Sequence, residues 1–394
     1  MRILLTAVPT VGHFHPLVPL AQAAAQAGHE VAFATGSALL PLVDRVGFLG
    51  FRAGLDSGHA ERAHPALRTL PGPDRADYFW QHIFAAERAQ AMLPDLLDLS
   101  ARWQPHVIVR DQAELGGYLA GERLGLPHAV VQTVVFRPRL HHLMAAPLNR
   151  LRVAGGLAAD PSLDTLYRYL FLSTAPPSYP DPTIAFPPTT HPLRPVPFDQ
   201  SGDEPRPAWL DALPDQPIVY ATLGTTSVNR RPDIFRAILE GLRDQALTLI
   251  LTIGRDQDPT QFGPQPPHVH VERYVPQTQL FPRCRVVIAH GGSGTTMAAL
   301  AHGLPMVLAP LAADQPENAE RCAALGVARV IQPAALTPET VRTNVLTVLR
   351  DPVYQHNAGR LRAEIAAMPG PEHAVELLER LVVDKGRAAA ASSC

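Results

Sequence analysis

Residues 286–309 read Val-Val-Ile-Ala-His-Gly-Gly-Ser-Gly-Thr-Thr-Met-Ala-Ala-Leu-Ala-His-Gly-Leu-Pro-Met-Val-Leu-Ala. A short apolar run leads into a glycine-rich loop at 290–294, and an Ala-rich stretch at 295–302 has the composition of a helix. Gly-Leu-Pro at 303–305 ends that helix, because Gly adopts the left-handed conformation without a Cβ penalty. A second apolar run follows at 307–309. Strand, loop, helix and strand in this order predict a βαβ unit with parallel strands.

The same order recurs in both halves of the chain. Further strands are expected at 3–8, 31–35, 107–109, 129–133, 218–223 and 247–253, and helices at 17–27, 115–124 and 372–381. Repeated βαβ units predict parallel sheets covered by helices. The predicted fold class is therefore α/β, with two doubly wound parallel-sheet domains in tandem.

A proline-rich stretch separates the two halves. Thirteen of the chain's 41 prolines lie between Pro176 and Pro217, which is incompatible with regular helix or strand. We interpret it as an interdomain connection; one long surface loop within a single domain is the alternative, and such loops are uncommon. The expected division is an N-terminal domain at 1–198, a linker at 199–215, a C-terminal domain at 216–370 and a final helix at 371–385.

Composition excludes several classes of protein. Among 394 residues, 34 Lys and Arg nearly balance 36 Asp and Glu, for a net charge of -2, which argues against a nucleic-acid partner. No apolar run approaches the ~20 residues of a membrane span, and the start of the chain lacks the features of a signal peptide. Three cysteines without CxxC spacing indicate no disulfide framework, so we expect a reduced, cytoplasmic setting.

The glycine-rich loop at 290–294 is the strongest local signal for a ligand. Its backbone N–H groups, the following helix N-terminus and the hydroxyls of Ser293 and Thr295 match a phosphate or pyrophosphate. A kinase-type P-loop is excluded because Thr295, and not Lys, follows the last glycine. A plain tight turn capped by Ser and Thr is the alternative. Downstream, Asp314 and Gln315 could hydrogen-bond vicinal sugar hydroxyls, and the stretch 273–277 upstream could face a base.

Several motifs together resemble one family. His290-Gly-Gly-Ser-Gly-Thr295, Asp314-Gln315 with Asn318, and Tyr274-Val-Pro-Gln277 are similar to the donor-binding signature of family 1 glycosyltransferases. The bacterial natural-product enzymes that decorate macrolides, enediynes and glycopeptides resemble the chain most. Gly12-His13-Phe-His15-Pro16 resembles the N-terminal acceptor-side motif of that family, so the resemblance spans roughly residues 1–385.

The resemblance implies a GT-B architecture, in which two Rossmann-like domains face each other across a cleft and the last helix crosses back to the N-terminal domain. It places the nucleotide sugar on the C-terminal domain. The implied donor contacts are Thr225, Thr226, His290, Gly292, Ser293, Gly294 and Thr295 for the diphosphate, Asp314 and Gln315 for the sugar, and Tyr274, Val275 and Gln277 for the base.

His13 occupies the general-base position of the family, and Asp111 matches its carboxylate partner. Chemistry supports this assignment, because an acceptor hydroxyl attacks poorly unless a base removes its proton. A carboxylate on the other ring nitrogen would hold the tautomer and stabilise the imidazolium. Asp111 stands at the C-terminal end of a predicted strand, where such sheets place ligand-facing residues. His15 is the alternative base, and both histidines have helix capping and local packing as a structural alternative.

Two metal signals compete with this reading. Asp256-Gln-Asp258 is a DxD motif, which holds a metal in another glycosyltransferase fold, but a solvated loop is the favoured interpretation here. Paired histidines occur at 13 and 15, 141 and 142, and 268 and 270, without a Cys or carboxylate that completes a zinc site. We therefore expect no metal and no cofactor besides the nucleotide sugar itself as co-substrate.

Apolar side chains in the divergent part of the N-terminal half are candidates for acceptor binding, with core packing as the alternative. They are Phe79, Trp80, Phe84, Phe136 and Met144. The predicted function is an inverting glycosyltransferase that moves a sugar from a dTDP- or UDP-sugar to a hydroxyl of a small apolar natural-product aglycone. The alternatives are a nucleotide-sugar epimerase of the same fold and a non-catalytic nucleotide-sugar-binding helper. A homodimer is compatible with the sequence, which does not fix the oligomeric state.

Overall fold

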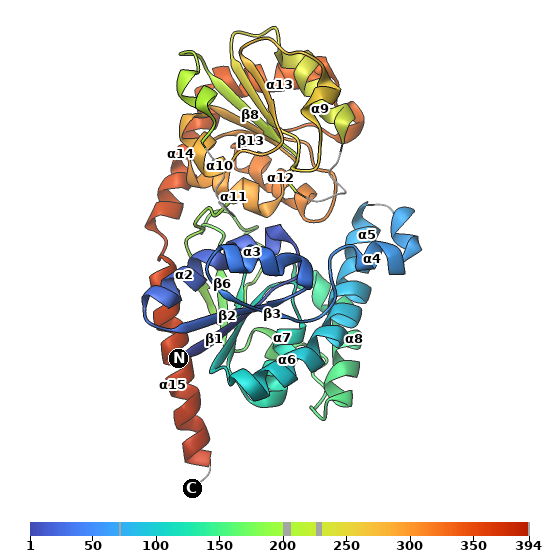
Figure 1. The fold of residues 1–394 in the computed structure, drawn as a ribbon, viewed down its shortest axis with the longest axis vertical. Helices are drawn as coiled ribbons and strands as arrows, with labels where there is room; N and C mark the ends of the chain where they lie inside the picture. Colours follow the sequence, from blue (N-terminus) through green and yellow to red (C-terminus); the bar gives the residue numbers. More distant parts are fainter. Residues whose placement is uncertain (71, 200–205, 226–230, 393–394) are drawn as a thin grey trace. The chain divides into compact units, whose positions relative to one another are not determined.

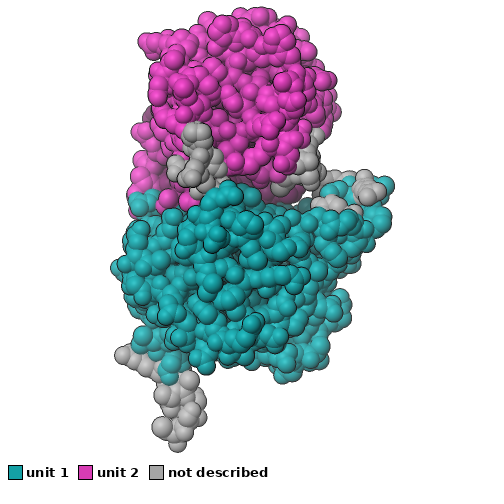
Figure 2. Space-filling view, in the orientation of Figure 1, with its two compact units in different colours: residues 1–175, 182–194, 368–394 teal, residues 176–181, 195–367 magenta. Residues whose placement is uncertain are grey.

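The computed structural model describes residues 1–70, 72–199, 206–225 and 231–392 (Figure 1). The chain forms two compact units (Figure 2). Unit 1 comprises residues 1–175, 182–194 and 368–394, and unit 2 comprises residues 176–181 and 195–367. The stretch that we expected to be a linker, 199–215, is part of unit 2. Residues 176–181, which we expected in the N-terminal domain, also belong to unit 2.

Unit 1 is built on a seven-stranded sheet in which every neighbouring pair is parallel. In spatial order the strands are β3 (Leu49–Arg52), β2 (Glu30–Thr35), β1 (Arg2–Thr6), β4 (Val107–Asp111), β5 (His128–Val131), β6 (Leu170–Ser173) and β7 (Thr190–Pro192). The order runs one way from β1 and the other way from β4. The boundary between these two strands is therefore a topological switch point, where open α/β sheets bind ligands.

Helices cover both faces of this sheet. They are α1 (Val11–Phe14), α2 (Val18–Gln26), α3 (Leu40–Arg45), α4 (His59–Ala63), α5 (Gly72–Tyr78), α6 (Ala89–Trp103), α7 (Gly116–Leu124), α8 (His141–Ala154) and α15 (Pro371–Ser392). A π-helical segment, η4 (Phe79–Arg88), joins α5 to α6. The last helix, α15, packs beside α2 (Figure 1). Lys385 on α15 donates a hydrogen bond of 2.7 Å to the Tyr169 hydroxyl, and Glu379 lies 3.0 Å from His29.

Unit 2 repeats the plan with six parallel strands and its own switch point between β8 and β11. The spatial order is β10 (Val269–Glu272), β9 (Thr248–Thr252), β8 (Ile218–Thr222), β11 (Val286–Ala289), β12 (Met306–Leu308) and β13 (Ala328–Val330). Its helices are α9 (Pro232–Leu242), α10 (Gln277–Leu280), α11 (Ser293–Ala301), α12 (Gln315–Ala324), α13 (Pro338–Arg350) and α14 (Pro352–Ala367).

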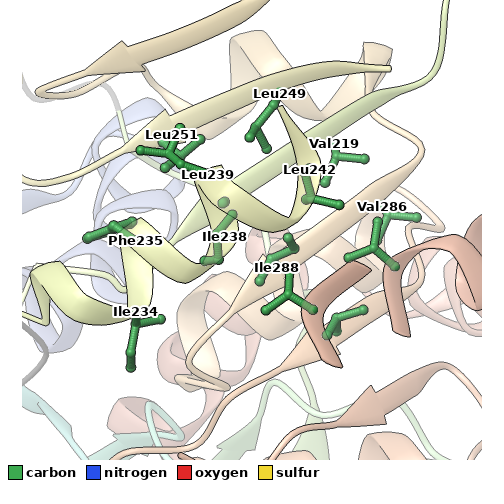
Figure 3. Packing of buried hydrophobic residues seen from close by; sticks show 14 of the residues in the cluster. Val219, Ile234, Phe235, Ile238, Leu239, Leu242, Leu249, Leu251, Val286 and Ile288 are labelled. Carbon is green, nitrogen blue, oxygen red and sulfur yellow. The ribbon is translucent and has the colours of Figure 1, made fainter. Parts of the chain in front are cut away.

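The core of unit 2 shows how alternation along the strands builds the layers. Val219, Leu249 and Ile288 point to one face of the sheet, where the apolar side of α9 packs on them (Figure 3). Tyr220, one residue further along β8, points to the opposite face and meets Phe281 at a ring distance of 5.7 Å. Side chains that are buried on both faces explain why these strands read as continuous apolar runs in the sequence.

The structure corrects some expected boundaries. The helix after the glycine loop begins at Ser293 and not at 295, because the extended backbone of Gly292 is its N-cap. The strand expected at 107–109 extends to Asp111, which is the last residue of β4. The final helix, expected at 371–385, extends to Ser392. Boundaries of this kind depend on backbone geometry that apolar periodicity does not determine.

Candidate functional site

In unit 1, His13 and Asp111 meet at the switch point between β1 and β4. His13 lies on the short helix α1 that follows β1, and Asp111 ends β4, the neighbouring strand. The Nδ1 atom of His13 is 2.9 Å from Oδ1 of Asp111. The Asp111 side chain is fully buried, whereas 17% of the His13 side chain is exposed. The alternative base, His15, is two residues further along and is the first residue of the next helical turn, η1 (His15–Leu17).

Backbone groups hold the Asp111 carboxylate in place. The amide of Val8 donates to Oδ2 at 2.6 Å, and the amide of Ala113 donates to Oδ1 at 2.7 Å. Thr133, after β5, places its hydroxyl 3.4 Å from His13 Nδ1. A buried carboxylate is costly unless it is hydrogen-bonded, and here both oxygens accept bonds. The arrangement fixes the imidazole with Nδ1 toward Asp111, so Nε2 is the ring nitrogen directed away from the carboxylate.

Two of the predicted acceptor residues lie near this pair. Phe84, on η4, has its ring centroid 6.4 Å from the His13 ring. Phe79, on the same segment, packs against Phe84 at 5.9 Å. Both side chains are half-buried. A π-helical turn is rare and frequently marks a functional site, and here it presents an aromatic surface beside the histidine.

The other three predicted acceptor residues are buried. Trp80, Phe136 and Met144 are 7%, 3% and 2% exposed and belong to one hydrophobic cluster with residues of α7 and α8. Core packing, the alternative considered for each from sequence, describes their position. Trp80 still contacts Phe84 at a ring distance of 5.2 Å, so it supports the aromatic surface from behind.

In unit 2, His290 follows β11 at the second switch point and lies between two glycines. A Cβ on Gly292 would lie 2.4 Å from Nε2 of His290, and one on Gly224 would lie 2.7 Å from its Cε1. Gly224 follows β8 with φ +76°, a conformation that favours glycine. The two backbones therefore approach the Nε2–Cε1 edge of the imidazole closely only because neither residue has a side chain.

Burial lowers the pKa of His290 to about 4, and Asp314 opposes this shift only in part. The imidazole is therefore neutral near pH 7. Its Nδ1 atom is buried without a hydrogen-bond partner among the described residues. A buried polar atom without a partner is rare in native structures and calls for an explanation such as a bound group.

Helix α11 begins at Ser293, and its N-cap residue, Gly292, has no side chain that could cap it. The first backbone N–H groups of a helix have no intrahelical acceptor and carry partial positive charge. An anion such as a diphosphate matches that chemistry. The Ser293 hydroxyl does not contribute here, because it donates to Asp314 Oδ2 at 2.7 Å. Gly294 and Thr295 complete the first turn of the helix.

Asp314 and Gln315 open helix α12, close to the start of α11. Asp314 is its N-cap residue and is buried. Ala313, directly before it, has φ +56°. This backbone conformation is strained for a residue with a side chain, and such strained residues cluster at functional sites. Gln315 uses its side-chain oxygen to accept from the amides of Leu311 and Ala312 at 2.7 and 2.9 Å.

The residues expected at the base lie directly before α10 and at its first position, Gln277. The Gln277 side chain donates to the Thr295 hydroxyl at 3.3 Å, which joins this segment to the glycine loop. The Tyr274 hydroxyl donates to the carbonyl of Asp199. Val275 is buried. Thr225 lies exposed after β8, and Thr226 lies outside the described residues.

The DxD motif has a local structural role. Asp258 caps a short helical turn by accepting from the Thr260 amide at 3.0 Å, as expected for a solvated loop. Within the described ranges, no group of three or more His, Cys, Asp or Glu side chains is arranged to hold a metal ion. None of the helices in the described part of the chain combines the length and apolar character that a bilayer-crossing segment needs.

The structure adds residues to these two sites to which the sequence analysis assigned no role. Thr133 near His13 and Gly224 beside His290 come from strands other than those carrying the histidines. Asn318 donates to both Ser293 and Asp314. Strand pairing would have identified the first two, because β5 and β8 end at the same sheet edges as β4 and β11.

Comparisons with known proteins identify the class. Residues 236–381 match the family described as Erythromycin biosynthesis protein CIII-like, C-terminal domain. The 10-deoxymethynolide desosaminyltransferase of Streptomyces venezuelae is 30% identical over 98% of this chain and 98% of its own length. The L-demethylnoviosyl transferase of Streptomyces niveus is 32% identical over 83% of this chain and 84% of its own length.

Solved structures agree with this class. A glycosyltransferase of Streptomyces sp. SF2575, crystallised with thymidine diphosphate, superposes with a TM-score of 0.78 at 26% identity, covering 96% of this chain and 99% of its own. The two parallel-sheet units thus have the GT-B fold. The chain belongs to the bacterial natural-product glycosyltransferases and is a glycosyltransferase of antibiotic biosynthesis type.

Proposed function

We propose that this glycosyltransferase moves a sugar, with inversion, from a dTDP- or UDP-sugar to a hydroxyl of an apolar natural-product aglycone. The observation that carries the proposal is the pairing of His13 with a buried, doubly anchored Asp111. A histidine in this arrangement can accept a proton on Nε2 while the carboxylate stabilises the imidazolium. Thymidine diphosphate in a solved relative supports a nucleotide donor.

In the proposed step, Nε2 of His13 takes the proton from the acceptor hydroxyl as its oxygen attacks the anomeric carbon. The new carbon–oxygen bond forms on the face opposite the diphosphate, and the bond from carbon to the diphosphate oxygen breaks. Negative charge develops on the leaving nucleoside diphosphate. The N-terminal amides of α11 and the loop at 290–292 would stabilise that charge. We propose that neither a metal ion nor another cofactor takes part.

Each feature of the donor site has a proposed ligand group. The diphosphate would lie at the loop 290–294, near the unpartnered Nδ1 of His290. Asp314 and Gln315 would face the sugar hydroxyls, and the segment at 274–277 would face the base. On unit 1, the rings of Phe84 and Phe79 would contact the aglycone beside His13. An apolar acceptor gains free energy by burying its surface on such rings.

The test is sugar transfer to a library of apolar aglycones with a panel of dTDP- and UDP-sugars, read by mass spectrometry. We expect a mass increment of one sugar on an aglycone with wild-type protein and a loss of about 10²–10⁴-fold in kcat for His13→Ala. His15→Ala is the matched control and should retain most activity. Conversion of the nucleotide sugar without any aglycone would instead indicate an epimerase. Nucleotide-sugar binding without turnover would indicate a helper protein.

A further inference from the structure

Residues 176–181, here called the inserted segment, belong to unit 2 although the chain on either side belongs to unit 1. Side chains of two unit 2 helices hold its backbone. Glu364 on α14 accepts from the Ser178 amide and hydroxyl at 3.1 and 2.7 Å. Arg321 on α12 donates to the carbonyls of Ser178, at 2.7 Å, and Tyr179. The segment is thus anchored on the helix that begins with Asp314 and Gln315.

Tyr179 directs its side chain into unit 2. The side chain is buried, and its hydroxyl donates to Oδ1 of Asn318 at 2.7 Å. The other neighbour of the hydroxyl is Cys322, whose Sγ lies 3.7 Å away. Burial raises the pKa of Tyr179 well above its usual value, so the phenol keeps its proton and acts as a donor. The bond to Oδ1 fixes which end of the Asn318 amide faces the tyrosine.

The opposite end of that amide reaches the donor site. Asn318 Nδ2 donates to the Ser293 hydroxyl at 3.1 Å and to Asp314 Oδ2 at 3.3 Å. The Ser293 hydroxyl donates to the same Oδ2 at 2.7 Å. Hydrogen bonds therefore run without a break from Tyr179 through Asn318 to the Asp314 carboxylate. Asn318 and Asp314 are both buried, and a buried network loses much of its value when one member is removed.

We infer that Tyr179 is a positioning residue for the donor sugar, which acts through Asn318 to hold the Asp314 carboxylate in the orientation that sugar hydroxyls require. The inference rests on the proposed function, because it assigns the sugar to Asp314. Tyr179 contacts neither the glycine loop nor the base segment in the described contacts, so its effect should fall on the sugar and not on the nucleotide.

The experiment compares Tyr179→Phe with wild type in the full chain, using isothermal titration calorimetry. The ligands are thymidine diphosphate and dTDP-glucose, or UDP and UDP-glucose if the uridine nucleotide binds more tightly. We expect Tyr179→Phe to weaken the sugar nucleotide about three- to tenfold, the effect of one hydrogen bond. The affinity for the diphosphate without sugar should not change. In turnover assays, the donor KM should rise by the same factor, with an unchanged acceptor KM.

Two control variants separate positioning from general loss of structure. Cys322→Ala removes the other neighbour of the phenol and leaves Asn318 intact, so we expect no change in sugar-nucleotide affinity. Tyr118→Phe removes a buried hydroxyl of unit 1 that lies 2.7 Å from the Thr165 hydroxyl, and it should also leave that affinity unchanged. Tyr179→Phe added to Asn318→Ala should cost little beyond Asn318→Ala alone, because both act on one path.

Equal weakening of diphosphate and sugar nucleotide by Tyr179→Phe would overturn the inference, as would no weakening of either. Additive losses in the Tyr179→Phe, Asn318→Ala pair would also overturn it, because the path through Asn318 would then be wrong. Failure of the wild-type protein to bind any sugar nucleotide of the panel would refute the proposed function itself and the inference with it. The first three results leave the proposed function standing.

Discussion

His13 and His290 lie in different units and have opposite surroundings. Each follows a strand at the switch point of its parallel sheet, β1 in unit 1 and β11 in unit 2. His13 is partly exposed and has a buried carboxylate 2.9 Å from its ring. His290 is buried between two glycines, and burial lowers its pKa to about 4.

The difference teaches that the chemistry of an imidazole at a switch point depends on its neighbours. A carboxylate on one ring nitrogen suits a group that gains a proton during reaction. Removal from water that a nearby anion offsets only in part suits a group that stays neutral and offers a hydrogen bond. On the proposed function, the two units would thus supply a proton acceptor in one case and an uncharged ligand contact in the other. The four predictions below test this contrast, from the largest expected effect to the smallest.

Asp111→Asn should remove the carboxylate that distinguishes the surroundings of His13 from those of His290. The amide keeps the size of the carboxylate but cannot stabilise an imidazolium, so we expect kcat to fall by about 10²–10⁴-fold. Nucleotide affinity should be unchanged, because the donor residues lie in unit 2. Steady-state kinetics and calorimetry measure the two quantities. Near-wild-type kcat for Asp111→Asn would contradict the assignment of His13 as the base.

Acid should destabilise the protein through His290. Its pKa is about 4 in the folded state against 6.5 ordinarily, so the unfolded chain binds the proton more readily. Stability is therefore complete above about pH 6.5 and is lost as the pH falls toward 4, with a loss of about 3 kcal/mol at the lower end. His290→Gln removes this titration. The urea midpoint of unfolding should thus decrease less between pH 7 and pH 5 for the variant than for wild type.

The matched control in the other unit is His128→Gln, because burial also lowers the pKa of His128 to about 4. This variant should flatten the acid response in the same sense. Parallel pH dependences for wild type and both variants would show that these imidazoles are not held neutral by burial.

Gly292→Ala should place a methyl group against the His290 ring. The new Cβ would lie 2.4 Å from Nε2, and Gly224 also approaches the same edge of the ring, so the ring has little room to adjust. Overpacking of this kind costs about 1–3 kcal/mol, and a loop distorted by that amount should bind the nucleotide roughly 5- to 150-fold more weakly. Gly359→Ala on α14 is the control, because a Cβ there meets nothing within 4 Å. Equal affinities of the two variants would place the nucleotide away from this loop.

Phe84→Ala should give the smallest effect and should act on unit 1 alone. Loss of the ring 6.4 Å from His13 removes apolar surface from the proposed acceptor side. We expect the acceptor KM to rise about three- to tenfold, the effect of losing part of one apolar contact, with an unchanged donor KM. Initial-rate measurements with each substrate varied in turn check this. A rise in donor KM of the same size would contradict an acceptor role for Phe84.

Much of the fold could be predicted because glycine and proline mark the ends of its elements. Gly303-Leu-Pro305 follows α11 and precedes β12, as the sequence predicted, and the apolar runs of β8, β9 and β11 are strands buried on both faces. The pairing of His13 with Asp111 was expected from the family resemblance, and strand positions and chemistry supported it. Parallel strands bring their carboxyl ends to one edge, so the sheet itself makes such pairs predictable.

Other features depend on packing that composition does not encode. Phe79 and Phe84 lie half-buried beside His13, whereas Trp80, Phe136 and Met144 are core residues, and all five belong to the same apolar class. Tyr179 lies in a proline-rich stretch without periodicity, so nothing in the sequence indicates its contact with Asn318, 139 positions away. The hydrogen bond from the Ser293 hydroxyl to Asp314 also had no signal in the sequence.

The inserted segment changes how hybrids of this enzyme and its relatives should be made. A crossover anywhere in 199–215 would join the first half of one parent to the second half of the other, and Tyr179 would then come from a different parent than Asn318 and Arg321. Exchanging donor specificity therefore requires transplanting residues 176–181 together with 195–367. A chimera made by joining two halves in the linker would combine Tyr179 of one parent with Asn318 and Arg321 of the other, and the hydrogen bonds between them would depend on residues that did not evolve together.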